Sequence, residues 1–139
     1  MQKKRLLLLK KTWRTLIVVY NFKRFNDTYG HLKGDDVLKT FAHVMQETLR
    51  ATDFVARFGG EEFMIVMPET TSEGAIHLAE RVRESMQKQS IVGIGEKVTA
   101  SFGVTMMHKD EKPTQIFMRA DRALYQSKES GRNQVTFLN

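Results

Sequence analysis

Residues 54–67 read FVARFGGEEFMIVM, and this stretch decides the fold because two strand-like apolar runs flank a pair of glycines. Gly59-Gly60 is a strong signal for a tight turn between antiparallel strands. Glu61 and Glu62 therefore fall at or just past the tip of a hairpin. Two adjacent carboxylates make sense if a cation sits beside them, and the bare glycine backbone leaves room for a phosphate. A divalent metal with a phosphate explains the pair, and so does an acidic turn in water.

Outside the hairpin, the chain alternates between strand and helix patterns. The run LIVVY at residues 16–20 has the β-branched composition of a buried central strand. Apolar spacing predicts the remaining elements, which are helices over about 35–50, from Thr71 and from Pro113, and strands over 98–106 and 135–138. The order strand, helix, strand, strand, helix, strand is that of ferredoxin-like α+β folds. We expect a mainly antiparallel sheet with its flanking helices on one face.

The composition is that of an ordinary globular protein, with 139 residues of which 41% are hydrophobic and 27% charged. We expect one domain over 1–139, with a basic, Leu-rich segment at 1–15 and the core at 16–139. The formal charge of +6 favours polyanionic partners. The chain has no cysteine, which excludes disulfides and thiolate zinc sites and fits a cytoplasmic protein. Its apolar runs are too short to span a bilayer, so we expect no membrane contact from this segment.

Several motifs follow one another in order along the chain. They are FKRFNDTYGH at 22–31, Gly34-Asp35, GGEEF at 59–63, ASFGV at 100–104, ADRALY at 120–125, Lys128 and Gly131-Arg132-Asn133. Over about 16–137 this pattern resembles the GGDEF family of diguanylate cyclases. These bacterial second-messenger enzymes have a nucleotidyl-cyclase palm and join two GTP molecules into cyclic di-GMP. The resemblance implies Mg²⁺ or Mn²⁺ as cofactor, and a homodimer when active because each protomer presents one GTP.

The resemblance also assigns the catalytic and metal-binding roles. At the matching positions, Glu61 and the backbone carbonyl of Val19 would bind the catalytic metal beside the triphosphate. Glu62 would support that site, and Lys23 would face a phosphate. For Lys23 a simpler interpretation, a solvated surface cation, stays open.

The substrate-binding positions follow in the same way. Asn26 and Asp35 would read the guanine edge, and Gly59-Gly60 would accommodate the phosphates. Lys128 and Arg132, one turn apart, would bind the β- and γ-phosphates. Local roles remain as alternatives: Asp35 would cap a helix, Asn26 would hold a turn, and the two cations would stabilise a helix C-terminus.

A second ligand site is implied by Arg50-Ala51-Thr52-Asp53, which begins nine residues before Gly59. Many members of the family carry an RxxD product-inhibition site at this offset, where Arg and Asp hold cyclic di-GMP. The alternative is a local pair that ends a helix and begins a strand. The offset from the hairpin favours the product site.

The chain departs from the family at the end of its first strand. The family pattern there is Asp-x-Asp, and its first carboxylate is a metal ligand, whereas this chain has Val18 and Tyr20. If one lost ligand costs roughly 3–5 kcal/mol of metal stabilisation, turnover falls about 10²–10⁴-fold. Two hypotheses follow: an impaired cyclase, or an inactive module that acts as a receptor for cyclic di-GMP or GTP.

A third hypothesis is a nucleic-acid binder, because the pI is near 9.7 and the fold is shared with RNA-recognition modules. Such modules need a basic and aromatic sheet surface. Here Glu61 and Glu62 at the centre of the sheet would repel a phosphate backbone. We therefore expect no nucleic-acid partner.

Overall fold

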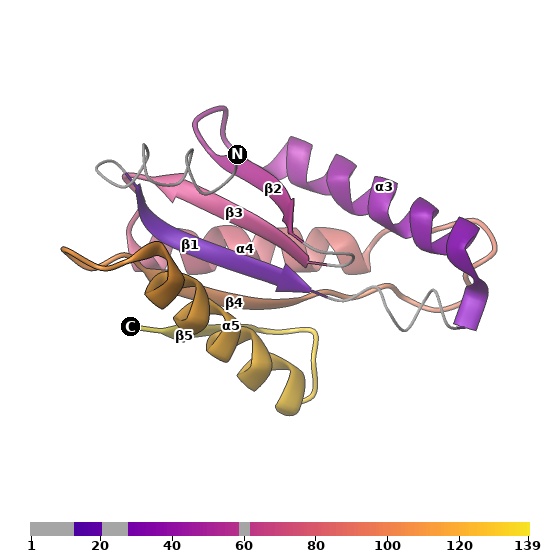
Figure 1. The fold of residues 1–139 in the computed structure, drawn as a ribbon. Helices are drawn as coiled ribbons and strands as arrows, with labels where there is room; N and C mark the ends of the chain where they lie inside the picture. The colour runs from indigo at the N-terminus through magenta and orange to yellow at the C-terminus, as the bar shows by residue number, and fades with distance from the viewer. Residues whose placement is uncertain (1–12, 21–27, 59–61) are drawn as a thin grey trace.

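The computed structural model describes residues 13–20, 28–58 and 62–139, with 13–20 and 58 described by their backbone alone (Figure 1). In chain order its elements are β1 (Trp13–Tyr20), α3 (His31–Thr48), β2 (Phe54–Phe58), β3 (Glu62–Pro68), α4 (Ser72–Gln87), β4 (Ser101–Met106), α5 (Pro113–Glu129) and β5 (Val135–Leu138). The predicted order of strands and helices is confirmed. Across the described ranges, no helix combines the length and apolarity needed to cross a membrane.

The strands form one five-stranded sheet in the order β2-β3-β1-β4-β5. Neighbouring strands are antiparallel except for β5, which runs parallel to β4 after the crossover through α5. The first four strands have the ferredoxin-like arrangement, so the α+β fold class is confirmed. The predicted edge strand at 135–138 is also confirmed.

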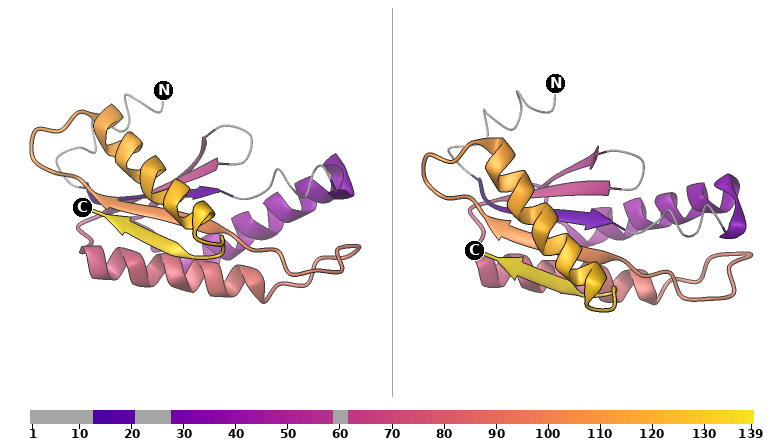
Figure 2. Two further views of the ribbon diagram at one scale, coloured as in Figure 1. Left: turned by 90° about the horizontal axis from the view of Figure 1, so that it is seen from below. Right: turned by 60° about the horizontal axis from the view of Figure 1, so that its bottom comes forward.

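The two helices of the ferredoxin-like unit, α3 and α4, share one face of the sheet as expected, and α5, which follows that unit, covers the other face. Alternate residues of β3 point to opposite faces. Phe63, Ile65 and Met67 belong to the core beneath α3 and α4, whereas Met64 and Val66 pack with α5. Figure 2 shows α5 on one side of the sheet and the other two helices on the opposite side. The unbroken apolar run of β3 is the sequence sign of a strand buried on both faces.

Helix α5 crosses β4 at Gly103, and this contact fixes how closely the helix approaches the sheet. A Cβ atom at Gly103 would clash with the carbonyl oxygen of Ala120 and the amide nitrogen of Leu124. It would also lie 2.9 Å from the Cα atom of Leu124. The glycine of the ASFGV motif is therefore required by close helix–strand packing.

An ion pair between Arg119 and Glu111 holds the loop before α5 against the end of β4. Arg119 donates to Glu111 Oε2 (2.9 Å), to Thr105 Oγ1 (2.6 Å) and to the Met106 carbonyl (2.6 Å). The backbone N–H of His108 also donates to Glu111 Oε2 (2.7 Å). The hydrogen bond from Arg119 and the one from His108 outweigh burial and lower the pKa of Glu111 from 4.5 to about 2.

We predict that Gly103→Ala lowers the free energy of unfolding by about 3 kcal/mol, because the added methyl group forces α5 away from β4. Chemical denaturation would measure this loss. The control is Gly95→Ala, since a Cβ at Gly95 meets no atom within 4 Å. Equal stability of the two variants would contradict the packing argument.

We also predict that stability depends on the protonation of Glu111. Because its pKa is lowered on folding, the stabilisation is fully present above the unfolded value of 4.5 and is lost as the pH falls toward about 2. The loss should be roughly 1–3 kcal/mol. Between about pH 5 and pH 2, the free energy of unfolding should depend less on pH in Glu111→Gln than in the unsubstituted chain. Glu96→Gln, which removes an exposed carboxylate, should keep the original pH dependence. A pH profile unchanged in Glu111→Gln would refute this role.

Candidate functional site

A row of three paired residues marks one end of the sheet. Tyr20 of β1 pairs with Glu62 of β3 on one side and with Ser101 of β4 on the other. Because neighbouring strands lie about 4.8 Å apart, the backbones of Glu62 and Ser101 are separated by roughly 10 Å. The predicted hairpin is confirmed by the pairing of Phe58 with Glu62, which puts the acidic segment at this end of the sheet.

The turn after α5 continues this row beyond β4. The backbone N–H of Asn133 donates to Ser101 Oγ (3.1 Å), and the side chain of Ser101 is buried. Arg132 immediately precedes Asn133, and its N–H donates to the Ser127 carbonyl in the last turn of α5 (2.9 Å). Lys128, half-buried, lies in that same last turn. The structure thus brings Glu62, Lys128 and Arg132 to the same end of the sheet.

Asp35 lies in α3, inside the helix rather than at its cap. The N-cap is Gly30, whose φ of 85° suits glycine, and no side chain caps the helix there. The alternative role of Asp35 as a helix cap is therefore wrong, and its carboxylate is exposed. Lys33 donates to the Val92 carbonyl (2.6 Å), which ties this part of α3 to the loop between α4 and β4. The helix begins beyond the end of the sheet at which β1 ends (Figure 1).

Five of the predicted site residues lie outside the described residues, namely Lys23, Asn26, Gly59, Gly60 and Glu61. Val19 is described by its backbone, within β1 and paired with Phe63 and Phe102. Within 28–58 and 62–139 no three His, Cys, Asp or Glu side chains come together as metal ligands. The carboxylate of Glu62 and the carbonyl of Val19 are hard oxygen donors, which suit Mg²⁺ or Mn²⁺.

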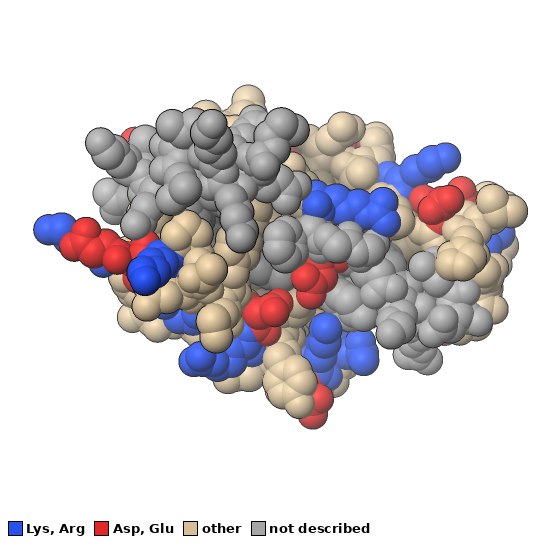
Figure 3. Space-filling view, viewed as in Figure 1, with Lys and Arg blue, Asp and Glu red and all other residues tan. Residues whose placement is uncertain are grey.

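Among the described residues, the charged side chains on the face that carries α5 do not form a single basic surface. On this face the described acidic and basic side chains lie interspersed (Figure 3). A nucleic-acid surface would be expected to show a continuous basic stripe.

Arg50 and Asp53 lie at the other end of β2 and form an ion pair with each other. The Asp53 carboxylate accepts from the Arg50 backbone N–H (2.8 Å), from Nη2 (3.0 Å) and, more weakly, from Nε (3.4 Å). The Asp53 side chain is 0% exposed, whereas that of Arg50 is 49% exposed. Arg50 also donates to Thr70 Oγ1. The local role predicted for this pair is therefore real, and the Arg50 side chain stays half-exposed.

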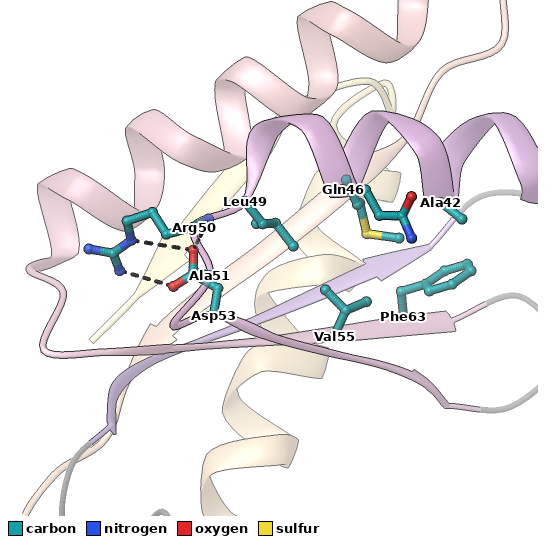
Figure 4. Close-up of a pocket in the computed structure, with 9 residues that line it drawn as sticks. Ala42, Gln46, Leu49, Arg50, Ala51, Asp53, Val55 and Phe63 are labelled. Carbon is teal, nitrogen blue, oxygen red and sulfur yellow. Dashed lines mark hydrogen bonds and ion pairs between the residues drawn. The ribbon is translucent and has the colours of Figure 1, made fainter.

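A hollow with a volume of about 600 Å³ adjoins this ion pair (Figure 4). Its walls come from the side of α3 that faces the hairpin, from the segment after α3, and from residues near the start of β2 and of β3. The lining residues are Ala42, Met45, Gln46, Leu49, Arg50, Ala51, Asp53, Val55 and Phe63. Apolar side chains predominate, and Arg50, Asp53 and Gln46 supply polar groups. The hollow was not predicted from the sequence. The only local sign of it is that Ala42 and Gln46, four residues apart, lie on the same side of a helix.

A family model described as diguanylate cyclase, GGDEF domain, matches residues 10–134. The chain belongs to this family. The resemblance inferred from the ordered motifs is thereby confirmed. Diguanylate cyclase A of Treponema denticola is 44% identical over 131 residues, which cover 91% of this chain and 35% of that protein. The chain thus spans about a third of the length of this relative.

Two solved structures resemble the domain closely. One is the active GGEEF domain of a diguanylate cyclase from Vibrio cholerae, with 35% identity and a TM-score of 0.85 over 98% of this chain and 88% of that one. The other is the GGDEF domain of DgcB from Caulobacter crescentus in complex with c-di-GMP, with 31% identity and a TM-score of 0.86 over 97% and 84%. The Vibrio domain has the same GGEEF hairpin sequence as residues 59–63 here.

Proposed function

We propose that this domain condenses two GTP molecules into cyclic di-GMP, with release of pyrophosphate. The observation that carries the proposal is the row Glu62–Tyr20–Ser101, extended by Asn133 and Arg132. It supports an arrangement in which a carboxylate-bound metal and two cations face one triphosphate.

Different residues would bind the metal, the phosphates and the guanine base. Glu61, Glu62 and the Val19 carbonyl would hold Mg²⁺ or Mn²⁺, which when bound would neutralise charge on the phosphates. Lys23, Lys128 and Arg132 would bind phosphate oxygens, with Arg132 able to use two parallel N–H donors. Gly59 and Gly60 would let the phosphates approach the backbone, and Asn26 and Asp35 would read the guanine edge.

The reaction needs two protomers, because each would present one half of the reacting pair. The 3′-hydroxyl oxygen of one GTP attacks the α-phosphorus of the other in line. A new phosphodiester bond forms, the bond from the α-phosphorus to the bridging oxygen breaks, pyrophosphate leaves, and the hydroxyl proton passes to solvent. Repetition in the opposite direction closes the ring. The protein contributes positioning and charge stabilisation without a covalent intermediate, so we propose a homodimer as the active unit.

In this mechanism Val18 lowers the rate of turnover, because it stands at the position of a metal-binding carboxylate. It pairs with Met64 and Gly103 and lies two residues before Tyr20 in β1. A carboxylate there would lie near the backbone carbonyl of Val19 and complete the metal site. Without it, we expect turnover to be lower by about 10²–10⁴-fold than with a complete set of ligands.

We predict that purified protein incubated with GTP and Mn²⁺ or Mg²⁺ forms cyclic di-GMP slowly, and that Val18→Asp forms it at least 10-fold faster. Nucleotide chromatography would measure product and pyrophosphate together. The control is Val18→Asn, which is similar in shape but carries no charge. Product formation by neither Val18→Asp nor the unsubstituted chain would reject the enzymatic proposal.

A receptor for cyclic di-GMP is the second candidate function, and the hollow beside Arg50 favours it. The half-exposed Arg50 side chain suits a phosphate or a guanine edge, and the apolar walls suit a purine ring. The Caulobacter GGDEF domain solved with c-di-GMP supports the choice of ligand. This role is compatible with catalysis, since Arg50 and Asp53 precede the start of β2 whereas Glu62 pairs with Phe58 at the end of that strand.

We predict that cyclic di-GMP binds to the protein and that Arg50→Ala weakens binding at least 10-fold, because a charged contact is lost. Ala42→Phe should weaken it similarly by filling the hollow while leaving the ion pair in place. Calorimetric titration would measure both, with Arg122→Ala on the exposed side of α5 as the control. Unchanged affinity in Arg50→Ala and Ala42→Phe would place any binding elsewhere.

A further inference from the structure

The turn after α5 has an unusual backbone and needs external support. Gly131, Arg132 and Asn133 have consecutive positive φ angles of 112°, 65° and 45°. Glycine and asparagine tolerate this region, whereas arginine rarely adopts it. Such a conformation persists where the surroundings over-determine it. Arg132 thus projects from a backbone that the rest of the fold must hold in place.

Asn133 connects this turn to two other elements. Its side-chain Oδ1 accepts from Arg83 Nη1 (3.1 Å), and its Nδ2 donates to Gln87 Oε1 (3.0 Å). Both partners lie in α4, on the opposite face of the sheet from α5. Its backbone N–H is bound to Ser101 of β4, as described above. Asn133 therefore fastens the turn at three points that belong to α4 and β4.

Arg83 is itself held in one orientation. Its Nε and Nη2 both donate to Glu80 Oε2 (3.0 and 2.7 Å), and its Nη1 is directed at Asn133. The Arg83 side chain is only 17% exposed. A planar guanidinium fixed on one side by a carboxylate presents its remaining N–H groups in a defined direction. Glu80, Arg83 and Asn133 form a connected chain of hydrogen bonds that ends at the residue next to Arg132.

We propose that Arg83, acting through Asn133, is a positioning residue that aims Arg132 at the terminal phosphates of the nucleotide. This inference rests on the proposed function, in which Arg132 binds β- and γ-phosphate oxygens. Arg83 does not touch the nucleotide, because its guanidinium is engaged by Glu80 and Asn133. Its effect is therefore specific to the triphosphate tail and leaves recognition of the guanine base unchanged.

The test compares the affinities for GTP and GMP, with Mg²⁺ present, in Arg83→Met and in the unsubstituted chain. We expect Arg83→Met to weaken GTP binding about 5- to 20-fold and to leave GMP binding unchanged. The matched control is Arg81→Met, which removes the same charge from an exposed position of α4 and should alter neither affinity. Equal weakening of GTP and GMP would overturn the proposal, because it would indicate general damage to the fold.

A double-mutant cycle separates positioning from an independent contribution. If Arg83 acts through Arg132, Arg83→Met should cause no further loss of GTP affinity in the Arg132→Ala background. Additive losses would refute the proposal. Asn133→Gly provides a second variant, because glycine accepts the positive φ angle but removes both side-chain anchors. It should reproduce the GTP-specific loss, and normal GTP affinity in this variant would also refute the proposal.

Amide hydrogen exchange distinguishes failure of this inference from failure of the proposed function. Exchange at Arg132 and Asn133 should accelerate in Arg83→Met and stay unchanged in Arg81→Met, whether or not a nucleotide is bound. Unchanged exchange in Arg83→Met would by itself refute the claim that Arg83 holds the turn after α5. If the unsubstituted chain bound no GTP at all, the proposed function and the phosphate-directed role would both fall. The exchange rates would then still decide whether Arg83 holds the turn.

Discussion

The register of β1 between β3 and β4 is the constraint on which the rest of the structure depends. It aligns Tyr20 with Glu62 on one side and with Ser101 on the other. A shift of the pairing by one residue would break this alignment and turn every side chain of the strand to the other face of the sheet. Because Ser101 holds the turn after α5, the same register brings the acidic hairpin and Arg132 to one end of the sheet.

Much of the fold could be predicted from sequence because its signals are local. The Gly-Gly turn between apolar runs predicted the hairpin, and the helical spacing predicted three helices in the correct order. The start of α3 was missed, since Gly30 caps it through a positive φ angle and offers no side-chain capping signal. The placement of α5 on the second face was also missed, although the unbroken run in β3 indicated burial on both faces.

The candidate site was harder to predict from the sequence, because the residues that hold it in place come from distant parts of the chain. Glu62, Lys128 and Arg132 were identified by family motifs, and the structure brings them to one end of the sheet. The contact between Arg83 and Asn133 joins residues 50 positions apart, and no local sequence pattern predicts it. The hollow beside Arg50 likewise depends on how α3 packs over the hairpin. Such features follow from tertiary packing rather than from sequence spacing.

The central claim is that one end of the sheet holds a triphosphate between the acidic hairpin and the turn after α5. A crystal structure with Mg²⁺ and a non-hydrolysable GTP analogue tests this most directly. We predict that the metal lies at Glu61 and Glu62 and that the terminal phosphates contact Lys128 and Arg132. A nucleotide bound elsewhere, or a structure in which this end of the sheet holds neither metal nor phosphate, would contradict the claim.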